Sequence, residues 1–370
     1  MKIMSFFHGL CCRLGKYVKQ NSNRNSMWRW EMVFSGQMQN LGINRTNISY
    51  NQVYRSLRYL KIKEREACSN LPDSVTELVT EDGCKVYLVG TIHYSRKSIM
   101  DVQQVIQMVQ PDAVVVELCK LREPFLTLDE RVIEEADKLD LNKIQALMKQ
   151  LGVWPTLWLI LLLKISDILT KELGILPGGE FRRAYREAQK IPFCQIYVGD
   201  RPFLITLKRF AATISAWDLV KTLIGLGFFS QPNAICKEVV QQIKKNHDFD
   251  QTVQLMKAEI PALYRTFVVE RDIYLTQSLK DVAKPILLPK ISPSEPQQVI
   301  PSVVVGVVGC AHVAGIKKYW NKQLNTQELL RLPDPSLLSR IFQVTSVVAV
   351  YGLKTYFYYK IAQIVIWLFA

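Results

Sequence analysis

The sequence predicts an α/β protein with a mixed, largely parallel sheet, flanked by many helices and followed by a C-terminal, membrane-associated helical segment. Two observations predict the sheet. A strand, an amphipathic helix and a second strand follow one another within about 33 residues, as in a βαβ unit, and a strand with a similar ending recurs near residue 303. A third observation, a long C-terminal stretch without acidic residues, predicts the membrane segment.

The βαβ unit begins with "CKVYLVG", a short run of β-branched, aromatic and other apolar residues that is typical of a buried strand. "SIMDVQQVIQMVQ" follows as a predicted helix whose apolar residues share one face, and Pro111 ends it before the second strand, "DAVVVEL". The two strands should be parallel with a right-handed crossover. Ligands of such sheets bind at the carboxyl ends of the strands, where His93 and Glu117 are expected.

The rest of the chain reads as further helices and strands. Residues 121–190 are largely helical and end in "LPGGEFRRAYREAQK". "IPFCQIYVGDRPFLITLKRF" is a strand leading into a helix, with Asp200 as N-cap and Pro202 in the first turn. A helix, "VVERDIYLTQSLKDV", precedes the proline-rich "KPILLPKISPSEPQQVIP", which predicts a loop. The strand "SVVVGVVG" then leads through a turn holding His312 into the helix "GIKKYWNKQL".

Three regions are expected: a basic, poorly structured N-terminal region at 1–72, an α/β domain at 73–335 and a hydrophobic membrane segment at 336–370. Residues 1–70 carry twelve Lys and Arg against three acids, and so +9 of the net charge of +14. Their first twenty residues suit either an amphipathic mitochondrial transit sequence or a flexible basic tail. No nucleic-acid-binding motif accompanies this charge, which makes nucleic acid the least favoured partner.

The C-terminus, "IFQVTSVVAVYGLKTYFYYKIAQIVIWLFA", contains only Lys354 and Lys360 as charged residues. A spanning helix needs about 20 apolar residues, and Lys354 divides the stretch. A tilted span with a snorkelling lysine, a tight hairpin and an interfacial helix pair all remain open. Each implies a membrane as a partner, and the alternative to membrane attachment is a buried core helix.

Two stretches share the form strand-Gly-x-x-His: "VYLVGTIHYS", which contains His93, and "VVVGVVGCAHVAG", which contains His312. Only four histidines occur in 370 residues, so this repetition favours a common site. Glycine permits a sharp exit from each strand and a close approach of the backbone. If the strands are neighbours, the two imidazoles converge.

Two imidazoles and a carboxylate suit a divalent metal such as zinc, cobalt or manganese. Glu117, at the end of an otherwise apolar strand, is the natural third ligand, because a buried carboxylate needs a cation or strong donors. The metal would polarise a carbonyl and activate water, while Glu117 or Glu180 takes a proton. Four arginines could bind an oxyanion or substrate carboxylate, or instead brace helices through ion pairs: Arg122, Arg182, Arg201 and Arg271.

At these residues the chain resembles the TraB family, also written TraB/PrgY/GumN, with the Tiki membrane proteases and erythromycin esterase-like enzymes as distant relatives. The stretches that carry the resemblance run in family order over about residues 85–320: "VYLVGTIHYS", "PDAVVVELCKLR", "LGILPGGEFRRAYREA", "VGDRPFLITLKR", "ERDIYLTQSL" and "VVGVVGCAHVAGI".

The resemblance implies that the two family histidines fall on His93 and His312, the carboxylate on Glu117 and the nearby basic residue on Arg122. The remaining polar motif positions fall on Glu180 with Arg182, Asp200 with Arg201, and Glu270 with Arg271. Similarity to the Tiki branch implies a metal-dependent peptidase. The eukaryotic members that this chain resembles imply an organelle membrane, with the mitochondrial outer membrane as the expected one.

The leading hypothesis is therefore a membrane-anchored protein with a metal-dependent, peptidase-like hydrolase site acting on a peptide, protein or other carbonyl substrate. The alternative is a non-catalytic adaptor or tether at an organelle membrane. A homo-oligomer is compatible with either hypothesis.

Overall fold

The computed structural model describes residues 71–128, 141–215, 257–258 and 260–333, with eight further residues between 51 and 65. These residues fall into two compact units. Unit 1 draws on Met1–Asp137, Leu169–Phe203 and Val268–Thr326, and unit 2 on Lys138–Ile168, Leu204–Phe267 and Gln327–Ala370. Unit 1 contains the sheet and all nine residues predicted for the site.

The sheet of unit 1 has five strands in the order β1-β2-β7-β3-β4. They are β1 (Val75–Val79), β2 (Lys85–Thr91), β7 (Val303–Gly309), β3 (Ala113–Val116) and β4 (Gln195–Val198). β1 is antiparallel to β2, and the other three pairs are parallel. The predicted mixed, largely parallel sheet is confirmed, whereas the antiparallel edge strand β1 was not predicted.

β7 lies between the two strands of the predicted βαβ unit, and this places three strand ends together. Gly309 is paired with Thr91 at the end of β2, and Val307 with Val116 at the end of β3. Every residue of β3 and β7 is buried, as expected for central strands covered on both faces. The segments that follow β2, β3 and β7 therefore leave the sheet at one edge.

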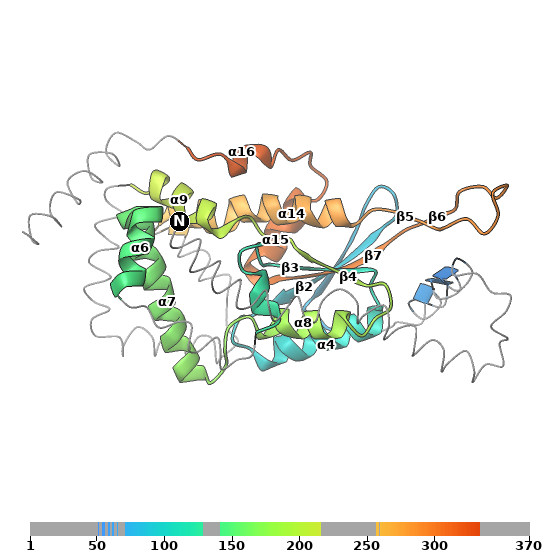
Figure 1. The fold of residues 1–370 in the computed structure, drawn as a ribbon, viewed down its shortest axis with the longest axis horizontal. Coiled ribbons are helices and arrows are strands. Elements are labelled where there is room, and N and C mark those ends of the chain that lie inside the picture. Colours follow the sequence, from blue (N-terminus) through green and yellow to red (C-terminus); the bar gives the residue numbers. More distant parts are fainter. Residues whose placement is uncertain are drawn as a thin grey trace, which may run out of the picture. The chain divides into compact units, whose positions relative to one another are not determined.

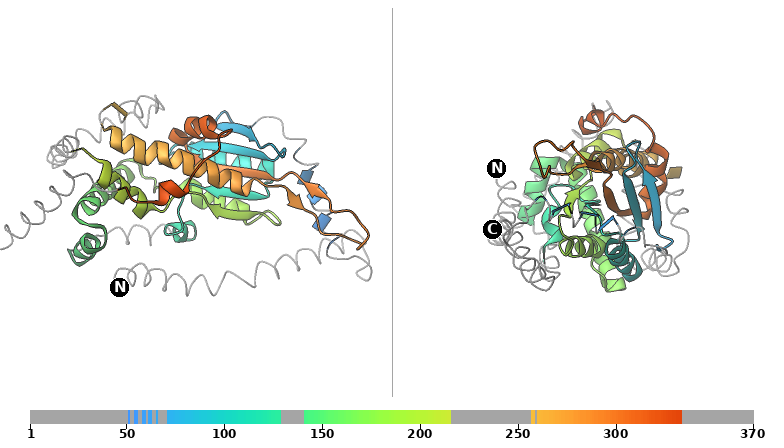
Figure 2. Two further views of the ribbon diagram at one scale, coloured as in Figure 1. Left: turned by 90° about the horizontal axis from the view of Figure 1, so that it is seen from above. Right: turned by 90° about the vertical axis from the view of Figure 1, so that its right-hand side faces the viewer.

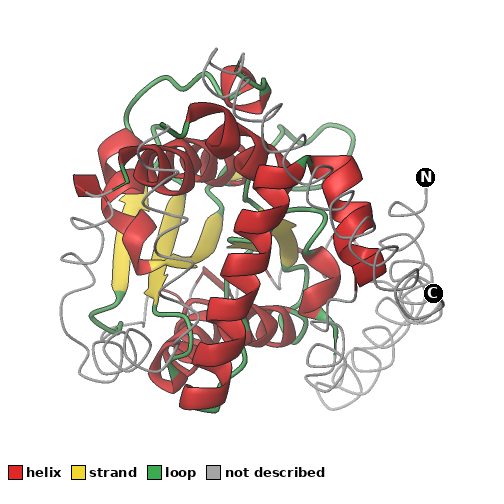
Figure 3. Ribbon diagram, turned by 90° about the vertical axis from the view of Figure 1, so that its left-hand side faces the viewer, coloured by secondary structure: helices red, strands yellow, loops and turns green. Residues whose placement is uncertain are grey.

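Helices cover both faces of this sheet, and two views of the molecule show the strands between them (Figure 1 and Figure 3). α4 (Arg96–Val109) and α8 (Gly179–Ala188) pack on one face, α14 (Glu270–Val282) and α15 (Cys310–Tyr319) on the other. The predicted apolar face of α4 buries Val102, Val105 and Ile106 in the first core. Leu275, Leu279 and Ile316 pack into the second core.

Local signals account for the ends of these helices. The Ser95 hydroxyl accepts from the Ser98 N–H at 3.4 Å and caps α4, and Gln110 ends it in the left-handed conformation. Gly178, with φ of 75°, turns the chain into α8. A 3-10 turn (η1, Glu123–Leu126) follows Arg122, and a π turn (η2, Arg265–Val269) runs directly into α14.

The proline-rich segment is not wholly a loop. β5 (Ile286–Leu287) and β6 (Val299–Ile300) pair antiparallel as a short two-stranded sheet. Figure 2 shows this hairpin projecting beyond the amino-terminal end of β7, which it directly precedes in the chain. Its prolines fall outside the paired residues, which is why two short strands are compatible with them.

Residues between 51 and 65 contact the amino-terminal edge of the sheet. Arg58 and Arg65 both bind the Asp112 carboxylate, Arg65 at 2.9 Å, and the other Asp112 oxygen accepts from the Val303 N–H. Lys61 donates to the Pro192 carbonyl at 2.7 Å. The described part of the basic region therefore pairs with a buried acid, which argues that some of its charge serves the fold.

Unit 2 is helical in its described residues: α6 (Leu141–Leu151), most of α7 (Val153–Leu173), α9 (Phe203–Thr213), α13 (Pro261–Tyr264) and α16 (Gln327–Leu330). The Phe210 ring contacts those of Trp158 and Phe267, with centroids 4.8 and 5.7 Å away. In the ranges that the structure covers, no helix combines the length and apolar character that crossing a membrane requires. The predicted segment 336–370 and residues 1–50 lie outside those ranges.

Candidate functional site

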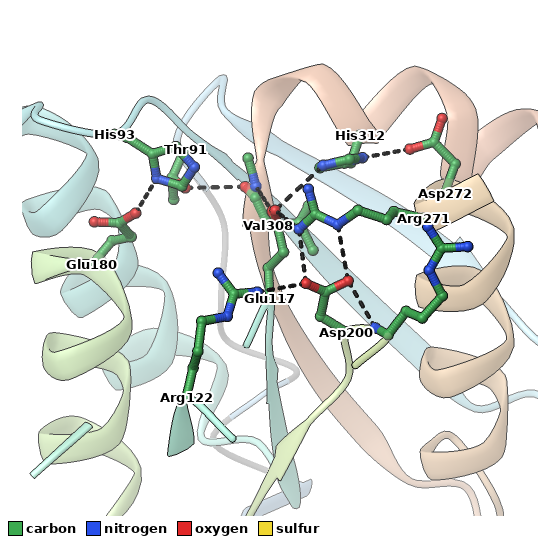
Figure 4. A network of polar contacts seen from close by, with 12 residues as sticks. Thr91, His93, Glu117, Arg122, Glu180, Asp200, Arg271, Asp272, Val308 and His312 are labelled. Atoms are coloured by element: carbon green, nitrogen blue, oxygen red, sulfur yellow. Dashed lines mark hydrogen bonds and ion pairs between the residues drawn. The ribbon is translucent and has the colours of Figure 1, made fainter. Parts of the chain in front are cut away.

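Three predicted residues meet at the carboxyl edge of the sheet. Glu117 directly follows β3, His93 lies two residues beyond β2, and His312 lies in the first turn of α15 after β7. Figure 4 shows the two histidines on either side of the Glu117 carboxylate, in a network with Glu180, Asp200, Asp272, Arg122 and Arg271. The prediction that the histidines converge at the sheet edge agrees with this arrangement.

His93 is the member that is open to solvent. Its Nδ1 lies 2.5 Å from Glu180 Oε1, and its side chain is 42% exposed. The loop is held by the Ile92 N–H, which donates to the Ser98 hydroxyl, and by a left-handed Tyr94. Desolvation is the largest influence and opposes the charged ring, but the hydrogen bond to Glu180 and the charges of Glu180 and Glu117 together outweigh it and raise the pKa of His93.

Glu117 is buried and receives three contacts. The Gly309 N–H donates to Oε2 at 2.6 Å, Arg271 Nη2 donates to Oε1, and His312 Nε2 lies 3.3 Å from Oε1. Burial alone would raise the pKa of this carboxyl, but His312 and Arg271 outweigh burial and hold it well below its ordinary value. Glu117 is therefore an ionised carboxylate at neutral pH.

His312 lies between two carboxylates. Its Nδ1 is 2.6 Å from Asp272 Oδ1 on α14, while Nε2 faces Glu117. Burial opposes protonation, yet Glu117 and Asp272 together raise the pKa of His312 to about 9. In the metal-free protein this ring is an imidazolium at neutral pH.

Asp200 joins two arginines of the site. Arg271 donates to it through Nε and Nη2 at 3.0 and 2.9 Å, and Arg122 Nη2 donates at 2.6 Å. The predicted N-cap role of Asp200 is wrong, because α9 begins at Phe203 and the carboxylate accepts instead from these guanidinium groups and from the Arg201 N–H. Charge-assisted bonds to two arginines are stronger than one bond to a helix terminus.

The remaining predicted residues lie around this network. Arg201 and Glu270, both buried, form an ion pair with each other at 2.6 Å. Arg182 Nη1 donates to the Pro177 carbonyl at 3.0 Å, next to the start of α8. These contacts correspond to the bracing role that the sequence left open for the arginines, whereas Arg122 is the arginine with a partly open side chain, 31% exposed.

The two Gly-x-x-His stretches differ in structure. His93 lies in a loop, whereas His312 is already inside α15, which begins earlier than predicted. Both glycines serve close packing, and neither has a positive φ. A Cβ on Gly90 would lie 2.9 Å from Val313 of α15, and one on Gly309 would lie 3.3 Å from Glu117 Oε2 and 3.6 Å from His93 Nε2. Gly309 therefore keeps the space between the three predicted ligands open.

Within the part of the chain that the structure describes, no group of three or more His, Cys, Asp and Glu residues is arranged to hold a metal ion. The Glu117 oxygens are instead shared among Arg271, His312 and the Gly309 N–H. In this arrangement the side chains at the carboxyl edge of the sheet can bind protons and orient charged groups. A metal ion bound there would have to displace the proton of His312.

Asp272 is the residue of this site that sequence reasoning missed. It follows Glu270 and Arg271 on α14. Glu270 binds Arg201, Arg271 binds both Asp200 and Glu117, and Asp272 binds His312. Three charged residues in a row on a helix with buried neighbours were the available signal.

This geometry defines a class: an α/β protein with a buried polar site at the carboxyl edge of a parallel sheet. The chain belongs to the TraB/PrgY/gumN family, whose pattern it matches over residues 77–326. It is 46% identical over 314 residues to a TraB domain-containing protein of Mus musculus, covering 85% of this chain and 83% of the relative.

A TraB domain-containing protein of Homo sapiens is 45% identical with the same coverage. An uncharacterized protein of Methanocaldococcus jannaschii is 27% identical over 247 residues, which are 66% of this chain and 56% of that protein. The predicted family is thus confirmed, and the matched region holds every residue of the site.

Proposed function

We propose that this chain is a metal-dependent hydrolase that cleaves a peptide bond or a related carbonyl compound. One observation carries the proposal. Both histidines engage a carboxylate through Nδ1, His93 with Glu180 and His312 with Asp272, so that a metal would bind through Nε2, which in His312 now faces Glu117. Metal-binding histidines are commonly oriented in this way by an outer carboxylate.

The donor types, two imidazoles and a carboxylate, suit such an ion, but the described side chains are not arranged around one, so binding would require them to move. His93, His312 and Glu117 would hold it, and the space above Gly309 that a Cβ would fill lies among them. A bound zinc, cobalt or manganese ion would polarise the substrate carbonyl and lower the pKa of water. Binding must release the His312 proton and loosen the contact of Glu117 with His312, so affinity should rise with pH.

The surrounding residues have separate roles in this proposal. Substrate approaches from the side of His93 and Arg122, whose side chains are partly exposed, because Glu117 and His312 are buried. Arg122 binds the developing oxyanion or a substrate carboxylate. Arg271 orients Glu117, and Glu117 or Glu180 accepts the proton of the attacking water.

The test is hydrolysis of a peptide library by purified protein supplied with Zn²⁺, Co²⁺ or Mn²⁺. Glu117→Gln should abolish turnover, while Glu123→Gln, a nearby change outside the network, should retain it. If no metal gives turnover above that of Glu117→Gln, the hydrolase proposal is wrong.

We also propose that residues 336–370 attach the protein to an organelle membrane, with the mitochondrial outer membrane as the expected one. The support is the acid-free apolar stretch from Ile341. Removing 336–370 should release the protein from the membrane fraction of cells. If function is lost on that deletion but survives His93→Ala with His312→Ala, the adaptor or tether alternative is favoured.

A further inference from the structure

The contact between α14 and α15 holds a carboxylate against the buried histidine. Asp272 Oδ1 lies 2.6 Å from His312 Nδ1, and both side chains are buried. The opposite ring atom, Nε2, is 3.3 Å from Glu117 Oε1. Because the Asp272 bond is much the shorter, the one ring proton of neutral His312 belongs on Nδ1.

Gly315 makes this contact available. It lies three residues after His312 on α15, and therefore on nearly the same helical face. A Cβ at this position would be 2.9 Å from the Asp272 Cβ and would overlap its carboxylate outright. The Asp272 side chain thus occupies the volume that any other residue at 315 would fill.

From this geometry we infer that Asp272 is a positioning residue that fixes the tautomer of His312, and that Gly315 provides the space in which it does so. The inference rests on the proposed function, since Nε2 is the atom that the proposed site uses. With the proton held on Nδ1, the Nε2 lone pair faces Glu117 and the space above Gly309.

A positioning role of Asp272 differs from simple space filling in what an isosteric substitution does. Asn has the size of Asp, so Asp272→Asn preserves packing between α14 and α15. Its amide nitrogen, however, can donate to Nδ1, which moves the ring proton to Nε2 and blocks that atom. An isosteric change should therefore be as harmful to the site as Asp272→Ala.

The first arm of the test uses the metal-free, full-length protein. Side-chain ¹⁵N–¹H correlation spectra at a pH where His312 is neutral report which ring nitrogen carries the proton. We expect Nδ1–H in the wild type and Nε2–H in Asp272→Asn, with loss of the fixed tautomer in Gly315→Ala. Asp281→Asn, on the exposed side of α14, and Ala314→Ser, next to Gly315, are matched controls that should keep Nδ1–H.

The second arm measures Zn²⁺ binding by calorimetry. Asp272→Asn and Gly315→Ala should weaken it by about 10- to 100-fold, with no change in the two controls. If the tautomer in Asp272→Asn matches the wild type, the inference is overturned, whatever the metal result. If the tautomer shifts but wild type binds no metal, the positioning role stands and the proposed function fails. Thermal unfolding identifies any variant that has lost its fold. If Gly315→Ala does not fold, the tautomer of His312 in Asp272→Asn still decides the test.

Discussion

Gly309→Ala should inactivate the site while leaving the protein folded. The new Cβ would lie 3.3 Å from Glu117 Oε2, 3.6 Å from His93 Nε2 and 3.8 Å from His312 Cδ2. The closest of these contacts requires a shift of only a few tenths of an ångström. Gly309 has φ of −60°, which alanine adopts freely, so the loss of stability should stay near the cost of a poorer N-cap, about 1 kcal/mol.

The effect on ligand binding should be much larger. Metal ligands lie about 2.0 to 2.2 Å from zinc, so a methyl group among the three donors occupies the volume that the ion needs. Disturbing outer partners of metal ligands already costs about 10- to 100-fold, and we expect a loss at the upper end of that range, on the order of 100-fold. The Gly309 N–H that binds Glu117 is retained.

Gly306→Ala is the matched control on the same strand. Its Cβ would lie 2.9 Å from Leu279 and 3.1 Å from Leu88, inside the core and away from the site. Overpacking there should cost about 1 to 3 kcal/mol with metal affinity retained. Calorimetric metal titration and urea denaturation of both variants check the pair. Wild-type metal affinity in folded Gly309→Ala would refute the reasoning.

Three further predictions concern stability. Arg201→Met should lower the free energy of unfolding, measured by urea denaturation, by about 3 to 5 kcal/mol, because Glu270 loses its buried ion partner. The double variant Arg201→Met with Glu270→Leu should regain much of that stability, and additive losses in the double variant would contradict this explanation. The pKa of His312 is raised to about 9, so its stabilising contribution in metal-free protein is complete below about 6.5 and lost as pH rises through 9. Unfolding measured between about pH 6.5 and 9 should show this loss of stability in the wild type and not in His312→Gln. The same pH dependence in both proteins would argue against the raised pKa of His312. Asp112→Ala should destabilise by about 2 kcal/mol or more through loss of its bonds to Arg58 and the Val303 N–H, and an unchanged urea midpoint would contradict a stabilising role of Asp112.

The parallel strands and the meeting of His93, Glu117 and His312 could be predicted because they follow from local patterns. Each strand is a continuous apolar run, and parallel strands bring their carboxyl ends to one edge. β1 has no such pattern, since its residues are partly exposed. Its place in the sheet depends on pairing with β2.

Asp272 and Asp200 show where local reasoning ends. Asp272 contacts His312 across 40 residues of sequence, and only because Gly315 lets α14 and α15 approach closely. Asp200 has the sequence context of an N-cap, but Arg122 and Arg271 come to it from segments that lie 78 and 71 residues away. Such partners depend on how the helices pack, which the residues near Asp200 do not encode.

Metal content is the most direct test of the central claim that His93, His312 and Glu117 form a metal-dependent hydrolytic site. Protein loaded with Zn²⁺, Co²⁺ or Mn²⁺ and then freed of excess ion should retain stoichiometric metal as wild type and lose it as His93→Ala with His312→Ala. Wild type that retains no metal, or a double variant that retains as much as wild type, would contradict the claim.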